Sequence, residues 1–209
     1  MDAYKLIKED IQSFVRTWLK TGLISNPQIG GDFFSDLISI KSKLSLIKDE
    51  EEYIKNFVDN YEKGMYLLTI DDGSFFQAAY EFNRMKNAVY LVKASISYFP
   101  CVNAGKLIHP YIRLDYDSKI QNSFFHAITH LHIGFDNGIR IPTDEIPLFS
   151  EFFKFIMYLY YHDKFLKIVN KKAITDTHTK DRGRLTQYIP ISKELGDFVH
   201  LKLSNIQNI

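Results

Sequence analysis

Cysteine, tryptophan and proline are scarce in this chain of 209 residues, which holds one Cys, one Trp and six Pro. A single thiol, Cys101, excludes an intrachain disulfide framework and any zinc site built on two or more cysteines. No apolar run approaches the length of a membrane span, and charged residues stand near the N-terminus where a signal peptide has its apolar segment. We therefore expect a soluble cytoplasmic protein with no membrane partner.

The sequence also lacks an excess of charge of one sign. Its 26 Lys and Arg and 25 Asp and Glu leave a formal net charge of +1, so any site for RNA or DNA must be a local patch. Aromatic residues are plentiful, with 17 Phe and 13 Tyr, which is ample for a packed core. Length and composition together predict a single domain that spans residues 1–209.

Hydrophobic periodicity divides the chain into a helical part, residues 1–62, and a sheet-containing part, residues 63–209. Helical spacing is found over residues 3–23 and 32–61, and the acidic run at residues 49–52 is typical of a helix start. Alternation predicts strands at residues 65–70, 74–83, 88–99, 111–117, 129–135 and 139–142. An aromatic helix is predicted over residues 147–169, and a strand or short helix over residues 185–203. The predicted fold class is α+β, with N-terminal helices, a central antiparallel sheet and the C-terminal aromatic helix packed on it.

Residues 111–142 concentrate ionisable side chains, including three of the seven histidines. Alternate side chains of a strand share one face, so Arg113 and Asp115 point away from their apolar neighbours. His130 and His132 do the same on the next predicted strand. We expect these groups to share one exposed face of the sheet.

The turn at residues 136–138 decides where Arg140 points. A two-residue loop would place Arg140 opposite Phe135, on the apolar side. A three-residue loop with left-handed Gly138 would pair Gly134 with Arg140 and keep the apolar residues together. Burial favours the second loop, which predicts that Arg140 joins the histidine face.

Two chemistries suit such a face. In the first, His130 and His132 act as general base and general acid on a phosphodiester, Arg113 or Arg140 stabilises the developing charge, and Asp115 orients a histidine. In the second, His130, His132 and either His126 or an aspartate bind a divalent metal that activates water. The alternative without chemistry is a polar sheet surface with a cross-strand ion pair.

Four further side chains are candidates for substrate binding. They belong to the loop before the histidine strand and to the basic segment near the C-terminus, which carries a net charge of about +4 over residues 163–184. These candidates are His126, Lys172, Arg182 and Arg184.

The most distinctive motif is an Arg-x-Asp-x-Asp strand at residues 113–117 followed by His-Leu-His-Ile-Gly at residues 130–134. With the surrounding residues 65–165, it resembles an uncharacterised bacterial family of domains of unknown function, from which Ala127 departs because the family usually has proline there. Members of that family are encoded beside superfamily-1 helicases in anti-phage loci, so the resemblance implies a defence role and a helicase partner. The motif is also similar to that of toxin ribonucleases with an Arg-Tyr-Asp strand and clustered histidines.

These observations leave three readings open. The first is a nuclease, with ribonuclease favoured, that acts as the effector of a helicase-associated anti-phage system. The second is a non-catalytic partner or sensor subunit that regulates the helicase. The third is a metal-dependent hydrolase. An open cluster of the named side chains favours chemistry, whereas a buried cluster with its polar groups mutually satisfied favours a scaffold.

Overall fold

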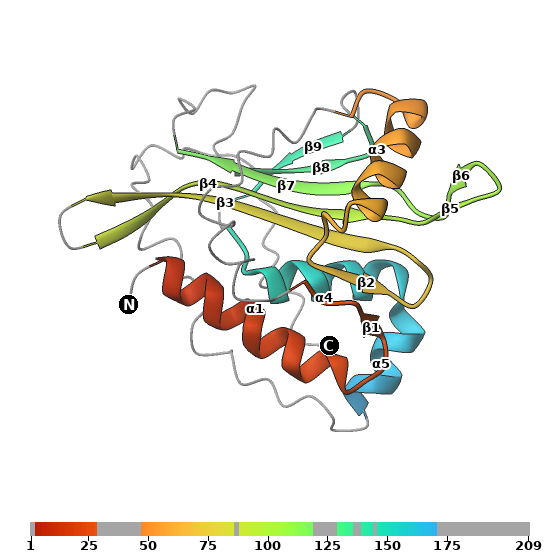
Figure 1. The fold of residues 1–209 in the computed structure, drawn as a ribbon, viewed down its shortest axis with the longest axis horizontal. Coiled ribbons are helices and arrows are strands. Elements are labelled where there is room, and N and C mark those ends of the chain that lie inside the picture. Colours follow the sequence, from red (N-terminus) through yellow and green to blue (C-terminus); the bar gives the residue numbers. More distant parts are fainter. Residues whose placement is uncertain are drawn as a thin grey trace.

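The computed structural model describes residues 3–28, 47–85, 88–118, 129–135, 139–143 and 146–170 (Figure 1). Its helices are α1 (Ala3–Leu19), α3 (Glu50–Glu62), α4 (Phe149–Tyr160) and α5 (His162–Asn170). Among these described residues, no helix combines the length and apolar character that a bilayer crossing needs. The predicted α+β class, with a central antiparallel sheet and aromatic C-terminal helices on it, is confirmed.

The central sheet has seven strands in the order β1-β2-β3-β4-β7-β8-β9, and every neighbouring pair is antiparallel. The strands are β1 (Ile24–Ser25), β2 (Leu68–Ile70), β3 (Phe75–Met85), β4 (Ala88–Phe99), β7 (Ile112–Asp117), β8 (Thr129–Ile133) and β9 (Ile139–Pro142). A separate hairpin, β5 (Val102–Asn103) with β6 (Lys106–Leu107), connects β4 to β7. Sheet order thus follows chain order, which is what short antiparallel connections produce.

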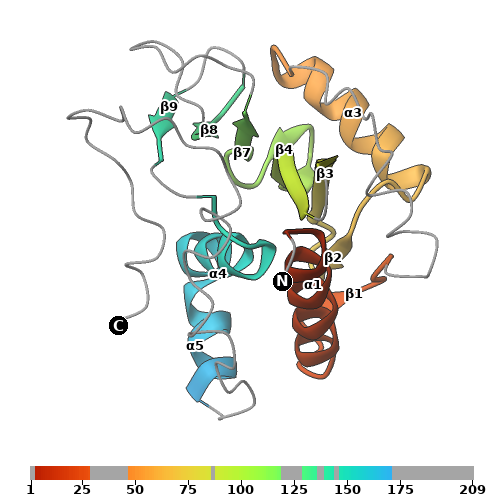
Figure 2. The ribbon, with the colours of Figure 1, turned by 90° about the vertical axis from the view of Figure 1, so that its left-hand side faces the viewer.

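Helices α1 and α4 cover one face of the sheet, and α3 lies on the other side (Figure 2). The apolar face of α1 packs, together with α4, on the strand side chains that point toward the helices. The helical residues in this core recur with a period of 3.6 and the strand residues with a period of 2. That core includes Ile11, Phe14, Trp18, Phe76, Leu114, Leu131, Phe152 and Phe153. Asp10 joins the two helices, because its carboxylate accepts hydrogen bonds from the Ser150 amide at 3.1 Å and the Ser150 hydroxyl at 2.5 Å.

Helix α3 begins where the acidic run predicts. Asp49 is its N-cap and accepts a hydrogen bond from the Glu52 amide at 2.9 Å. The helix buries Tyr53 against Phe99 and Tyr111, which close one end of the second sheet face. The rest of that face is left to polar side chains.

The C-terminal helical region differs from the single helix predicted over residues 147–169. It breaks at Tyr161, whose backbone leaves the helical region with φ −125° and ψ 29°. The Tyr161 hydroxyl donates to Asp72 at 2.6 Å and lies 2.7 Å from the Tyr98 hydroxyl. These tertiary hydrogen bonds override the helical periodicity, which is why α4 and α5 are two helices.

Candidate functional site

Two rows of side chains cross β4, β7, β8 and β9 on the second sheet face, the side on which α3 lies. Residues directly opposite each other in an antiparallel pair share a face, so each row is a line of neighbours. The first row is Ser97, Arg113, His132 and Arg140, and the second is Ser95, Asp115, His130 and Pro142. The pairing thus brings all five side chains that were predicted as catalytic onto one face.

The position of Arg140 confirms the predicted face but not the predicted register. Arg140 lies opposite His132 rather than opposite Gly134, a difference of two residues. Gly134 has φ +89°, so its backbone leaves the extended conformation and β8 ends one residue earlier, at Ile133. Because side chains alternate with a period of two, this shift leaves Arg140 on the histidine side. The predicted turn, residues 136–138, lies outside the described residues.

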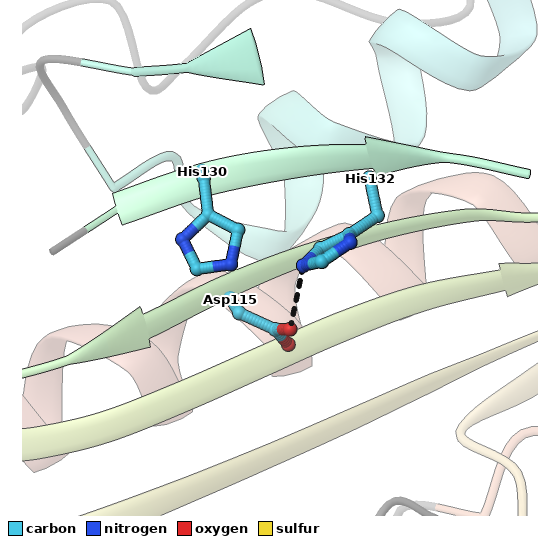
Figure 3. A group of neighbouring side chains, drawn as sticks. All are labelled: Asp115, His130 and His132. Carbon is cyan, nitrogen blue, oxygen red and sulfur yellow. Dashed lines mark ion pairs between the residues drawn. The ribbon is translucent and has the colours of Figure 1, made fainter. Parts of the chain in front are cut away.

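Asp115 is the centre of the site (Figure 3). Its Oδ2 accepts a hydrogen bond from Arg113 Nε at 2.8 Å and lies 3.3 Å from His132 Nε2. Its Oδ1 accepts from the Ser95 hydroxyl at 2.7 Å. His130 completes the cluster, with its ring centroid 4.6 Å from that of His132. The carboxylate therefore ties three strands together through side chains alone.

Burial of this cluster is the main correction to the sequence analysis, which placed it on an exposed face. Relative exposure is 5% for Arg113, 7% for His130 and 4% for His132. The Asp115 side chain retains 25% exposure, and Arg140 is exposed. Alternation predicts which face a side chain takes, but the depth of that face depends on tertiary packing.

The ionisation of Asp115 reflects these contacts. Burial alone would raise the pKa of its carboxyl, because it penalises the charged form. The hydrogen bond from His132, the charge of Arg113 and the hydrogen bond from Ser95 outweigh burial, so the pKa of Asp115 lies below its usual value. Asp115 is thus a carboxylate held by donors, suited to fixing the orientation of His132.

Asp115, His130 and His132 together have the donor types of a metal site. One potential ligand atom each from Asp115, His130 and His132 lies within 4.8 Å of the others. Two imidazoles and one carboxylate suit Zn²⁺ and other first-row transition metals. Arg113 opposes this use, because its permanently charged guanidinium already neutralises the only carboxylate of the triad.

Ser95, Ser97 and Tyr111 support the cluster, and none of them is among the predicted site residues. Ser95 holds Asp115 directly, and the Tyr111 hydroxyl donates to Ser97 at 3.4 Å beside Arg113. The signal available in the sequence was the two-residue spacing of the two serines, which alternate with the apolar residues 94, 96 and 98. That spacing gives them one face, but only the strand order places them beside β7.

The four predicted substrate-binding residues, His126, Lys172, Arg182 and Arg184, lie outside the described residues. The structure therefore does not place them relative to the cluster, and their role stays a prediction.

Fold and site together define an α+β protein with an Arg-Asp-His-His cluster on one face of an antiparallel sheet. Residues 102–196 match the family described as "Uncharacterized conserved protein (DUF2290)". The matched range includes β7, β8 and β9 and thus all five predicted catalytic residues. No curated protein and no solved structure matches the chain.

Proposed function

We propose that this chain is a nuclease, and specifically a ribonuclease, that acts as the effector of a helicase-associated anti-phage system. The observation that carries the proposal is the Asp115 carboxylate, held by Arg113 and Ser95 and placed 3.3 Å from His132 Nε2. A second imidazole, His130, stands beside the oriented one. Paired histidines suit acid–base work near neutral pH because their ordinary pKa lies there. The defence context and the helicase partner rest on the family resemblance alone.

The proposed reaction is transesterification of RNA. In this proposal the Nε2 of His132 faces Asp115 and its Nδ1 takes the proton of a ribose 2′-hydroxyl, so the substrate must displace what buries this ring, which is 4% exposed. The 2′-oxygen attacks phosphorus while the bond to the 5′-oxygen breaks, and His130 supplies the proton that this leaving oxygen needs. Arg140, exposed at the rim, binds the phosphate. The products are a 2′,3′-cyclic phosphate and a 5′-hydroxyl end.

Purified protein and end-labelled single-stranded RNA in EDTA test this proposal. We expect His130→Ala and His132→Ala each to lower the cleavage rate by about 10²- to 10⁴-fold, the range of acid–base contributions. The matched control is His162→Ala, because His162 is an exposed histidine of α5 outside the cluster. A 2′-deoxy substitution at the cleaved linkage should also stop the reaction. Undiminished cleavage by the double histidine variant would refute the proposal.

A second candidate is a non-catalytic partner or sensor subunit that regulates the helicase. Two observations favour it: both histidines are buried, and α3 with the turn after it exposes apolar side chains. Val58, Tyr61 and Met65 are 44%, 42% and 47% exposed. Co-purification with the helicase encoded nearby discriminates the two candidates. This candidate predicts a stable complex that Val58→Glu with Met65→Glu disrupts, and no RNA cleavage with or without divalent metal.

A further inference from the structure

The cluster contains a cation of its own where a metal would bind. Arg113 lies against one oxygen of Asp115 and one ring nitrogen of His132 that could each coordinate an ion. Its Nε is 2.8 Å from Asp115 Oδ2, and its Nη2 is 3.5 Å from His132 Nε2. A metal bonded to Asp115 Oδ2 at about 2.1 Å would lie within about 5 Å of that guanidinium nitrogen.

Because Arg113 is both charged and buried, its proximity strongly disfavours the binding of a metal ion. The guanidinium has no neutral form in proteins, and Arg113 is only 5% exposed, so water does little to screen it. The triad holds a single carboxylate, and its negative charge is already matched by Arg113. A divalent ion would therefore enter a site with no net negative charge and with a fixed positive charge beside it.

We infer that Arg113 is a built-in cation that excludes metal from the triad of Asp115, His130 and His132, and that removing its charge turns the triad into a transition-metal site. Arg113 pairing and metal coordination then compete for the same Asp115 oxygen. The inference concerns the class of ligand that the cluster accepts, and it stands whether or not the chain cleaves RNA.

Cobalt binding to the full-length, tag-free protein tests the inference. Visible absorption reports on the coordination of Co²⁺ by imidazole and carboxylate, and calorimetry with Zn²⁺ gives affinity and stoichiometry. We expect Arg113→Met to bind one ion at least about 100-fold more tightly than the wild type, because the nearby buried charge is gone. Adding His130→Ala to this variant should remove the gain.

Arg140→Met is the matched control. It removes the same charge from the same row of the sheet, but Arg140 is exposed and its register partner is His132. We expect this variant to bind metal as weakly as the wild type. If circular dichroism shows that Arg113→Met does not fold, Arg113→Gln replaces it with the same expectation, since its amide can still donate to Asp115.

Three outcomes would overturn the inference. The first is tight metal binding by the wild type that depends on His130. The second is a folded, uncharged Arg113 variant that gains no affinity. The third is an equal gain in Arg140→Met, which would show that overall charge rather than the position of Arg113 controls binding.

Discussion

The ion pair between Arg113 and Asp115 predicts an unequal response to the loss of either partner. The Arg113 side chain is 7% exposed and the Asp115 side chain 25% exposed. Asp115→Asn leaves a permanently charged guanidinium buried without its counter-ion. Arg113→Met leaves a carboxylate that still accepts from Ser95 and His132 and reaches water. Asp115→Asn should therefore be the more damaging change.

The magnitudes follow from the two environments. Removing one partner of a buried pair costs about 3–5 kcal/mol, and the partial exposure of Asp115 places Asp115→Asn near 3 kcal/mol. For Arg113→Met we expect about 1 kcal/mol, because the remaining carboxylate keeps other donors and the methionine fills the apolar part of the space. In the Arg113→Met background, Asp115→Asn should cost less than about 1 kcal/mol, since no buried charge is then stranded.

Urea unfolding followed by circular dichroism at pH 7 measures all four members of this double-mutant cycle. The wild type, both single variants and the double variant should share one m value, so that midpoints report stability. Our reasoning is wrong if Arg113→Met destabilises as much as Asp115→Asn. It is equally wrong if the two effects add within about 0.5 kcal/mol, because contacting residues should couple.

Two further predictions concern acid stability and the α3 interface. Because the folded-state pKa of Asp115 is lowered, the stability that this carboxylate contributes is present above its unfolded pKa of about 3.9 and is lost as pH falls through the folded value. In urea titrations from pH 6 to pH 3, Asp115→Asn should therefore lose less stability than the wild type, and equal losses would contradict this. Tyr53→Phe removes a buried hydrogen bond of 2.6 Å to the Pro100 carbonyl and should lower the free energy of unfolding in urea by about 1–2 kcal/mol. Tyr61→Phe, at an exposed position of the same helix, should change it very little, and equal losses would contradict this reasoning.

The sequence predicted structure best in elements where a single hydrophobic periodicity, helical or alternating, determines which side chains are buried. Alternation predicted β4 over residues 88–99 with the bounds that the structure has, and it predicted the face of every residue in the Arg113 row of β7 and β8. Helical spacing also predicted the start of α1, whose stripe packs into the core, but the helix ends at Leu19 rather than at residue 23. In these elements local pattern and burial agree, so no other interaction competes.

The features that the sequence did not predict depend on contacts between residues far apart in the chain. The helix break at Tyr161 requires Asp72, which is 89 positions away, and no local pattern announces it. Two-residue segments such as β1 and the β5–β6 hairpin are too short to have a period. The burial of the histidines likewise follows from tertiary packing, and the support from Ser95 follows from strand order. Arg140 was placed on the correct face with the wrong partner, because a shift of two residues is invisible to alternation.

The hydrogen bonds between Asp10 and Ser150 have a consequence for synthesis in the cell. They join residues 140 positions apart, and α4 covers the same apolar stripe of α1 that Asp10 adjoins. At about 5–20 residues per second, the ribosome needs on the order of 10 s to make the chain between them. During that interval the stripe has emerged and has no α4 to pack on. The nascent chain should therefore need a chaperone most while the sheet is being made, and least after α4 appears.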